Sequence, residues 1–178
     1  KGIIAAGAAI HYLHETQHDK ISYISSLSRI DQGQFVWLDK FTIRNLELLH
    51  SANANAKTLI DIIDKTTSPM GSRLMRRWLS LPLKNKDQIT ARYEIVDFFV
   101  NNNEYISGFQ DAIRQVGDLE RLISKVSLLR VNPRELLQVA RALDQIEIIK
   151  QLCAESNNEA LKLYSEQLNV CDSIRQRV

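Results

Sequence analysis

Three closely spaced arginines are the first residues whose types and spacing could do chemistry. Arg73, Arg76 and Arg77 follow one another at i, i+3 and i+4, so a helix would carry them on one face. Guanidinium groups gathered on one face can bind phosphates or an acidic partner. They can equally remain solvated or pair with carboxylates such as Asp61 and Asp64. Three arginines fall short of the long basic row that a duplex binder needs, so we expect ion pairing or solvation and keep a DNA or partner contact as the alternative.

A second candidate is a histidine-rich segment near the N-terminus. His11, His14, Glu15 and His18 are spaced so that one helical face could carry several metal ligands. Zinc sites converge three or four ligands, and no matching cluster of Cys or His occurs elsewhere in the sequence. We therefore expect a polar helix end here, with no metal residues, and keep a small metalloenzyme built on these histidines as an alternative hypothesis.

The other chemically capable side chains have structural explanations. Asp118 suits the N-cap of a helix, and Glu120 suits its first turn, where the helix dipole favours negative charge. No second acid converges with them as a catalytic pair would require. Trp37 and Trp78 could stack on bases, but each has apolar neighbours at a spacing typical of core packing. We predict that both tryptophans belong to the core.

Recognisable catalytic motifs are missing from the sequence. It contains no phosphate-binding loop, no nucleophile elbow, no HExxH and no calcium loop. The net charge of +2 does not by itself indicate nucleic-acid binding. Cys153 and Cys171 fit no zinc or redox spacing, which favours a reduced, cytoplasmic protein. We expect no catalytic and no cofactor-binding residues, so that this chain is not an enzyme by itself.

Helices are expected to position these residues. Ser68 as N-cap, Pro69 at the first position and Pro82 beyond the end define a short helix that holds the arginines. One small β-hairpin is predicted from 21–24 and 35–38, joined by a turn at 31–34. Further helices are predicted from apolar residues at steps of three and four over the following ranges: 3–16, 41–49, 59–65, 85–100, 105–116, 119–129, 132–155 and 161–178.

The predicted fold class is mainly α: a multi-helix array with long helices towards the C-terminus. If helical throughout, residues 133–155 extend about 35 Å at about 1.5 Å per residue. The spacing of apolar residues predicts that the last segment also continues as a long helix, to Val178. Long paired helices suit the transmission of position from one end of a domain to the other.

The segment Ser68-Pro69-Met70-Gly71-Ser72-Arg73-Leu74-Met75-Arg76-Arg77-Trp78-Leu79 resembles the core region of the MutS family of DNA mismatch repair proteins. Members of this family carry Thr-Pro-Met-Gly-x-Arg-x-Leu-(Lys/Arg)-x-Trp-Leu, so Ser68 replaces the usual Thr and Met75 the usual Leu. Four further runs are similar to family segments and come in the family's order: Tyr12-Leu13 with Thr16-Gln17, Thr42-Ile43-Arg44-Asn45-Leu46-Glu47-Leu48, Leu59-Ile60-Asp61-Ile62-Ile63-Asp64 and Val116-Gly117-Asp118-Leu119-Glu120-Arg121.

The resemblance implies the first segment of the MutS core, or lever, domain over residues 21–178, ending before the clamp. Residues 1–20 would be the helix that enters from the connector domain, and the chain would be part of a longer protein. The family domain couples the ATPase to the mismatch-binding and clamp regions. ATP and Mg are then bound outside this chain, and no membrane is involved. The implied partners are mismatched double-stranded DNA through neighbouring domains, a second MutS subunit and a MutL-type protein. The alternative is a stand-alone helical module that binds nucleic acid, through Arg73, Arg76 and Arg77, or protein.

Overall fold

A computed structural model describes residues 2–16, 24, 26, 33–53, 55–175 and 177 of the chain. The described part is mainly helical, as the sequence predicts. The helices are α1 (Gly2–Glu15), α2 (Lys40–Asn45), α3 (Leu59–Ile63), α4 (Pro69–Ser80), α5 (Lys86–Asn101), α6 (Asn103–Val116), α7 (Leu119–Ser127), α8 (Pro133–Glu155), α9 (Glu159–Gln167) and α10 (Asp172–Arg175).

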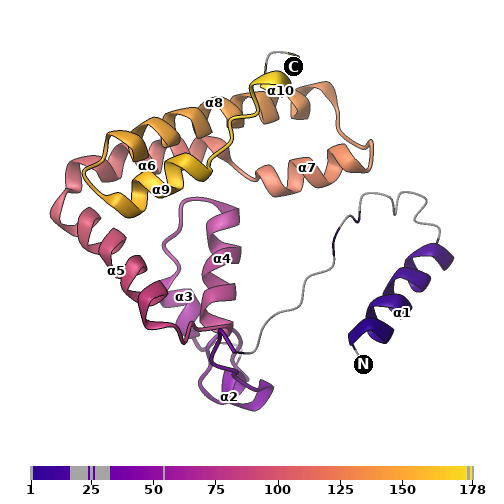
Figure 1. Ribbon diagram of the computed structural model, residues 1–178. Helices are drawn as coiled ribbons and strands as arrows, with labels where there is room; N and C mark the ends of the chain where they lie inside the picture. The colour runs from indigo at the N-terminus through magenta and orange to yellow at the C-terminus, as the bar shows by residue number, and fades with distance from the viewer. Residues whose placement is uncertain are drawn as a thin grey trace.

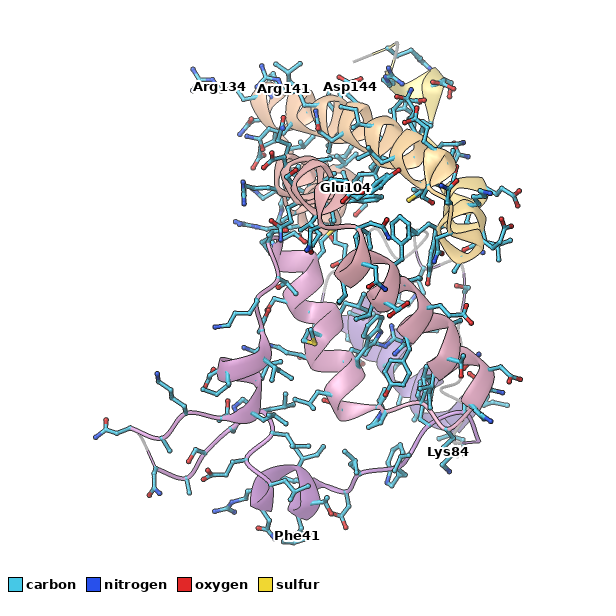
Figure 2. The ribbon with its side chains drawn as sticks, turned by 90° about the vertical axis from the view of Figure 1, so that its left-hand side faces the viewer. Phe41, Lys84, Glu104, Arg134, Arg141 and Asp144 are labelled. Carbon is cyan, nitrogen blue, oxygen red and sulfur yellow. The ribbon has the colours of Figure 1, made fainter. Side chains whose placement is uncertain are left out.

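The longest helix, α8, is the element on which the C-terminal half packs. It lies against α6, α9, α7 and α10, and α5 leads from this bundle to α4, α3 and α2 (Figure 1). Figure 2 shows Arg134, Arg141 and Asp144 along α8 at the top of the view and Phe41 of α2 at the bottom. The chain therefore has a helical bundle, α6–α10, and a smaller lobe, α2–α4, with α5 between them.

The bundle core is an aromatic and aliphatic cluster. Phe109, Cys153 and Leu161 are buried at its centre, from α6, α8 and α9. Phe99 of α5 meets Phe109 edge to face, with the two ring centroids 5.1 Å apart. Burying these side chains removes apolar area from water, which is the main force holding α5, α6, α8 and α9 together.

Side-chain caps fix where several helices begin. Ser68 accepts a hydrogen bond from the Gly71 amide at the start of α4, and Asn85 accepts one from the Gln88 amide at the start of α5. At α8, Asn132 accepts from the Glu135 amide while the Glu135 carboxylate accepts from the Asn132 amide, which completes a capping box. These predicted starts of α4, α5 and α8 are confirmed.

The apolar stripes of α6 and α8 point into the core, whereas that of α5 does not. Phe109 and Val116 of α6 are buried. On α5, Tyr93, Val96 and Val100 are exposed, and the opposite side of the helix, with Phe99, packs against the cluster. Because α5 is apolar on more than one side, helical spacing identifies the helix but not its buried face.

The predicted hairpin is not supported. Its first strand, 21–24, lies outside the described residues except for Ile24, and the segment 35–38 is not a strand. Phe35 forms instead an isolated antiparallel bridge with Leu83. The Val36 amide donates to the Pro82 carbonyl at 2.7 Å, and the Lys84 amide donates to the Gln34 carbonyl at 3.0 Å. The chain that follows α4 therefore takes the hydrogen bonds that the hairpin would have used.

The prediction of two long C-terminal helices holds only for α8. Helix α9 ends at Gln167, and residues 168–171 are not helical. Cys171 has a φ of 52°, a left-handed conformation that cannot continue an α-helix. The Leu168 carbonyl accepts from the Lys150 ammonium at 3.0 Å, so a side chain of α8 satisfies the end of α9.

Two further observations concern exposed apolar groups. Trp37 and Trp78 are 60% and 41% exposed, so their predicted place in the core is wrong. Helix α1 buries none of its residues and carries exposed Ile3 and Ile4. Among the residues that the structure describes, no helix is both long and apolar enough to cross a membrane.

The capping box gives a first prediction. Replacing Asn132 with Ala removes the acceptor of the Glu135 amide at the start of α8, and we expect a loss of about 1 kcal/mol in the free energy of unfolding. Urea denaturation followed by circular dichroism measures it. The matched control is Gln138→Ala, an exposed position inside the same helix, where Ala should be neutral or slightly stabilising. Equal effects of the two changes would contradict the importance of the cap.

Candidate functional site

Helix α4 carries the three predicted arginines, and its first turn is held close to the preceding loop. The Asp64 carboxylate accepts hydrogen bonds from the hydroxyls of Ser72 and Thr66. A Cβ atom at Gly71 would lie 3.1 Å from the Thr66 Cβ, closer than ordinary van der Waals contact. Glycine at this position therefore lets the start of α4 lie directly against residues 64–66.

Arg73 forms a forked ion pair with two carboxylates at the start of α7. Its Nη1 and Nη2 atoms lie 3.1 and 2.6 Å from the two oxygens of Asp118. Its Nε and Nη2 atoms lie 2.9 and 2.6 Å from Oε2 of Glu120. The planar guanidinium matches this geometry in a way that a lysine ammonium does not.

The forked ion pair of Arg73 with Asp118 and Glu120 shifts the pKa values of the groups that form it. The Arg73 guanidinium, together with the Arg121 amide, holds the pKa of Asp118 below its usual value. The two carboxylates in turn raise the pKa of Arg73, which stays charged. Asp118 also caps α7, and Glu120 lies in its first turn, so both negative charges face the positive end of the helix dipole.

A second ion pair holds the other end of α7. Lys125, near the C-terminus of α7, pairs with Glu135 at the start of α8. The Lys125 ammonium is the main cause of the lowered pKa of Glu135, and the Asn132 amide adds to it. Helix α7 is therefore tied to α4 at one end and to α8 at the other.

The other two arginines of α4 have different surroundings. The charge of Arg76 contributes to the lowered pKa values of Asp61 and Asp64, although hydrogen bonds from Thr58 and from Ser72 are the larger causes. Arg77 lines a groove between α4, α5 and α9. The expected ion pairing is thus present at Arg73. Its partners are Asp118 and Glu120, which the sequence analysis did not identify as partners. A contact from these arginines to DNA or to a partner stays a prediction.

The groove beside Arg77 has a volume of about 530 Å³. Its apolar lining includes Trp78, which stacks under the Arg92 guanidinium with 3.7 Å between the guanidinium carbon and the ring centroid. Arg92 was missed by the sequence analysis. The sequence gives little indication that Arg92 stacks on Trp78, because the two residues are 14 positions apart and lie on different helices.

A second cavity, of about 700 Å³, lies in the bundle between α5, α6, α8 and α9. Its lining is almost entirely apolar and includes Cys153. Burial raises the pKa of the Cys153 thiol, which keeps it in the unreactive protonated form. The cavity therefore offers space but no catalytic group.

The histidine segment is only partly described. His11 contacts Glu15 at 3.3 Å within α1, and His18 lies outside the described residues. Within the described ranges, no three His, Cys, Asp or Glu side chains are grouped so that they could hold a metal ion. Among the residues that the structure describes, none beyond Glu15 is found beside His11 as a further ligand.

Charge at the fork gives a second prediction. Because the lowered pKa of Asp118 favours the folded state, the contribution of the ion pair is complete above the ordinary aspartate pKa of 3.8 and disappears as the pH falls below it. Arg73→Gln should therefore lower the urea midpoint at pH 7 and have less effect at about pH 3. The control is Arg114→Gln, which breaks an exposed i, i+3 pair with Asp111 and should have little effect at either pH. A destabilisation that persists unchanged at the lower pH would mean that packing, not charge, is lost at Arg73.

Comparison with known proteins identifies a matching family and relatives of high sequence identity. The family described as MutS domain III matches residues 41–178. The chain is 51% identical over 178 residues to the DNA mismatch repair protein MutS of Christiangramia forsetii, covering 100% of this chain and 20% of that protein. It is 51% identical over 177 residues to MutS of Flavobacterium psychrophilum and 47% identical over 177 residues to MutS of Bacteroides thetaiotaomicron, in each case covering 99% of this chain. The chain spans about a fifth of the length of these relatives.

Proposed function

The chain belongs to the MutS family and corresponds to its domain III, and from this premise we propose that it acts as a mechanical relay within a DNA mismatch repair protein. In this proposal the helices couple an ATPase to mismatch-binding and clamp regions. ATP, Mg, mismatched DNA, a second subunit and a MutL-type partner are then bound by other parts of the protein. The chain itself contributes rigidity and position.

The observation that carries this proposal is the ionic connection from α4 through α7 to α8. Arg73 of α4 holds Asp118 at the start of α7, and Lys125 near the end of α7 holds Glu135 at the start of α8. A displacement of α4 is thereby passed to α8 without requiring the intervening helices to unfold. Coupling between distant sites needs such a physically continuous set of contacts.

Helix α8 has the properties of a rigid rod. It is 23 residues long, which corresponds to about 35 Å, and it packs against α6, α7, α9 and α10 along its length. Val139, Ala140, Ala142 and Leu143 are buried within one turn and a half of the helix. The small alanine side chains allow neighbouring helices to approach closely, so that α8 moves together with them.

Direct DNA binding by the arginine face is less well supported. The fork contacts of Arg73 are satisfied by Asp118 and Glu120, so phosphate binding would require breaking them. This removes one of the three charges on which a stand-alone nucleic-acid module would depend.

Breaking α8 tests the relay. Ala140→Pro removes a helical hydrogen bond and introduces a steric clash in the interior of α8, at a cost of about 3 kcal/mol or more. In the complete protein in which this chain occurs, we expect mismatch affinity to lose its response to ATP, as measured by fluorescence anisotropy with and without nucleotide.

The matched control for this change is Ala140→Gly, which costs about 1 kcal/mol without a kink. It should retain most of the ATP response. If Ala140→Pro leaves both mismatch binding and its ATP response unchanged, α8 is not the relay.

Binding of DNA by the chain alone discriminates the two functions. We expect fluorescence anisotropy with matched and mismatched duplexes to show no binding, or weak binding that salt abolishes and that ignores the mismatch. Tight binding that prefers the mismatch, and that Arg76→Gln with Arg77→Gln abolishes, would instead support a nucleic-acid-binding module.

A further inference from the structure

We propose that Arg175 is a positioning residue that fastens α10 to α8, so that residues 168–175 form a strap that moves together with α8. The proposal rests on the proposed relay and deepens it, because it names α10 as the helix that receives the displacement of α8. Three observations carry it: a guanidinium shared by several carboxylates, a second anchor at the other end of the strap, and a fixed turn between the two anchors.

The Arg175 guanidinium lies among three carboxylates. Its Nε atom is 2.6 Å from Oδ1 of Asp144, and its Nη1 atom is 3.4 Å from Oε2 of Glu147. The Nη1 atom also lies 3.6 Å from Oδ1 of Asp172, within α10 itself. Asp144 and Glu147 are neighbours on the surface of α8, so one side chain of α10 contacts two positions of the longer helix. A lone surface pair stabilises little, whereas a cation shared by several carboxylates restrains position more firmly.

The other end of the strap is anchored by Lys150 of α8. Its ammonium donates to the carbonyl of Leu168, directly after α9, at 3.0 Å. Asp144, Glu147 and Lys150 follow one another along α8 at steps of three, so the anchors extend over about two turns of that helix. In Figure 1 the chain leaves α9 below α8 and reaches α10 above it, so the strap crosses α8 between its two anchors.

The turn between the anchors has a fixed backbone. Val170 is buried, and the Cys171 amide donates to the side-chain oxygen of Asn169 at 2.9 Å. An Asn side chain that accepts from the amide two residues later forms a local turn. The carbonyl of the left-handed Cys171 then accepts from the Ile174 amide at 2.8 Å as α10 forms. A strap with such a turn cannot lengthen freely, so its two ends follow the helix to which they are tied.

Arg175 continues the ionic connection on which the relay depends. The Arg73 fork joins α4 to α7, and the pair of Lys125 with Glu135 joins α7 to α8. The contacts of Arg175 add the step from α8 to α10, two helices that also pack against each other. The connection then leads from the smaller lobe to α10 through contacts between neighbouring elements at every step, as coupling between distant sites requires.

The first experiment asks whether Arg175 holds α10. Hydrogen exchange with mass spectrometry follows residues 168–175 in the complete protein in which this chain occurs. We expect Arg175→Gln to speed exchange of the α10 amides by about threefold or more, because the contacts that restrain α10 are lost. The matched control is Lys162→Gln, which breaks an i, i+3 pair with Glu159 inside α9 and disconnects no two helices. It should leave exchange of the strap unchanged.

The second experiment asks whether α10 belongs to the relay. Fluorescence anisotropy measures the mismatch affinity of the complete protein with and without ATP. Arg175→Gln should leave the nucleotide-free affinity within about twofold of the parent value and reduce the change caused by ATP by about fivefold or more. A purely structural role would weaken both. Arg175→Lys, which keeps the charge, should restore part of the ATP response, and so should the charge exchange Asp144→Arg with Arg175→Asp.

Three outcomes overturn the proposal. Exchange of residues 168–175 that is unchanged in Arg175→Gln, or equally changed in Lys162→Gln, means that these ion pairs do not hold α10. Faster exchange with an intact ATP response in Arg175→Gln, while Ala140→Pro abolishes that response, means that the relay stands but ends at α8. An ATP response that survives both Arg175→Gln and Ala140→Pro means that the relay itself fails, and the coupling role of Arg175 fails with it.

Discussion

The forked ion pair between Arg73 and the carboxylates of Asp118 and Glu120 connects α4 of the smaller lobe directly to α7 of the bundle. Helix α4 also lies beside α5 and α9, where Trp78 stacks under Arg92 and the groove separates the three helices. A guanidinium that reaches two carboxylates at once restrains direction as well as distance, since its donors lie in one plane. The smaller lobe is therefore joined to the bundle in part by a polar contact, whereas the bundle is held by its buried aromatic cluster.

The sequence was informative where a local rule decides the structure. Ser68 before Pro69 and Asn132 with Glu135 follow capping preferences that involve only neighbouring residues, and they mark the starts of α4 and α8 correctly. The buried face of α6 also follows from spacing, whereas on α8 the predicted stripe is buried at Val139, Ala140 and Leu143 but exposed at Leu136. The helical class and the family resemblance could likewise be predicted, and the comparisons confirm the family.

The sequence was not informative where distant segments compete. The segment 35–38 has the composition of a strand, but its hydrogen bonds go to the chain after α4, a partner that no local pattern identifies. Helical spacing continues past Gln167, yet the left-handed Cys171 separates α9 from α10. The partners of Arg73 lie 45 and 47 residues away, so the candidate site could be predicted as a set of arginines but not as a connection between helices.

The separation along the chain between contacting residues has a consequence for the order of folding. Helices α8 and α9 are adjacent in sequence, so their pairing closes a short loop. The Arg73 fork joins residues 45 and 47 positions apart, whereas the buried contact of Phe109 with Leu161 joins residues 52 positions apart (161 − 109), so the two contacts close loops of similar length at a similar entropic cost. The pairing of α8 with α9 therefore has a lower loop-closure cost than either the Phe109 cluster or the fork. The Arg73 fork slows unfolding only to the extent that it forms after the transition state.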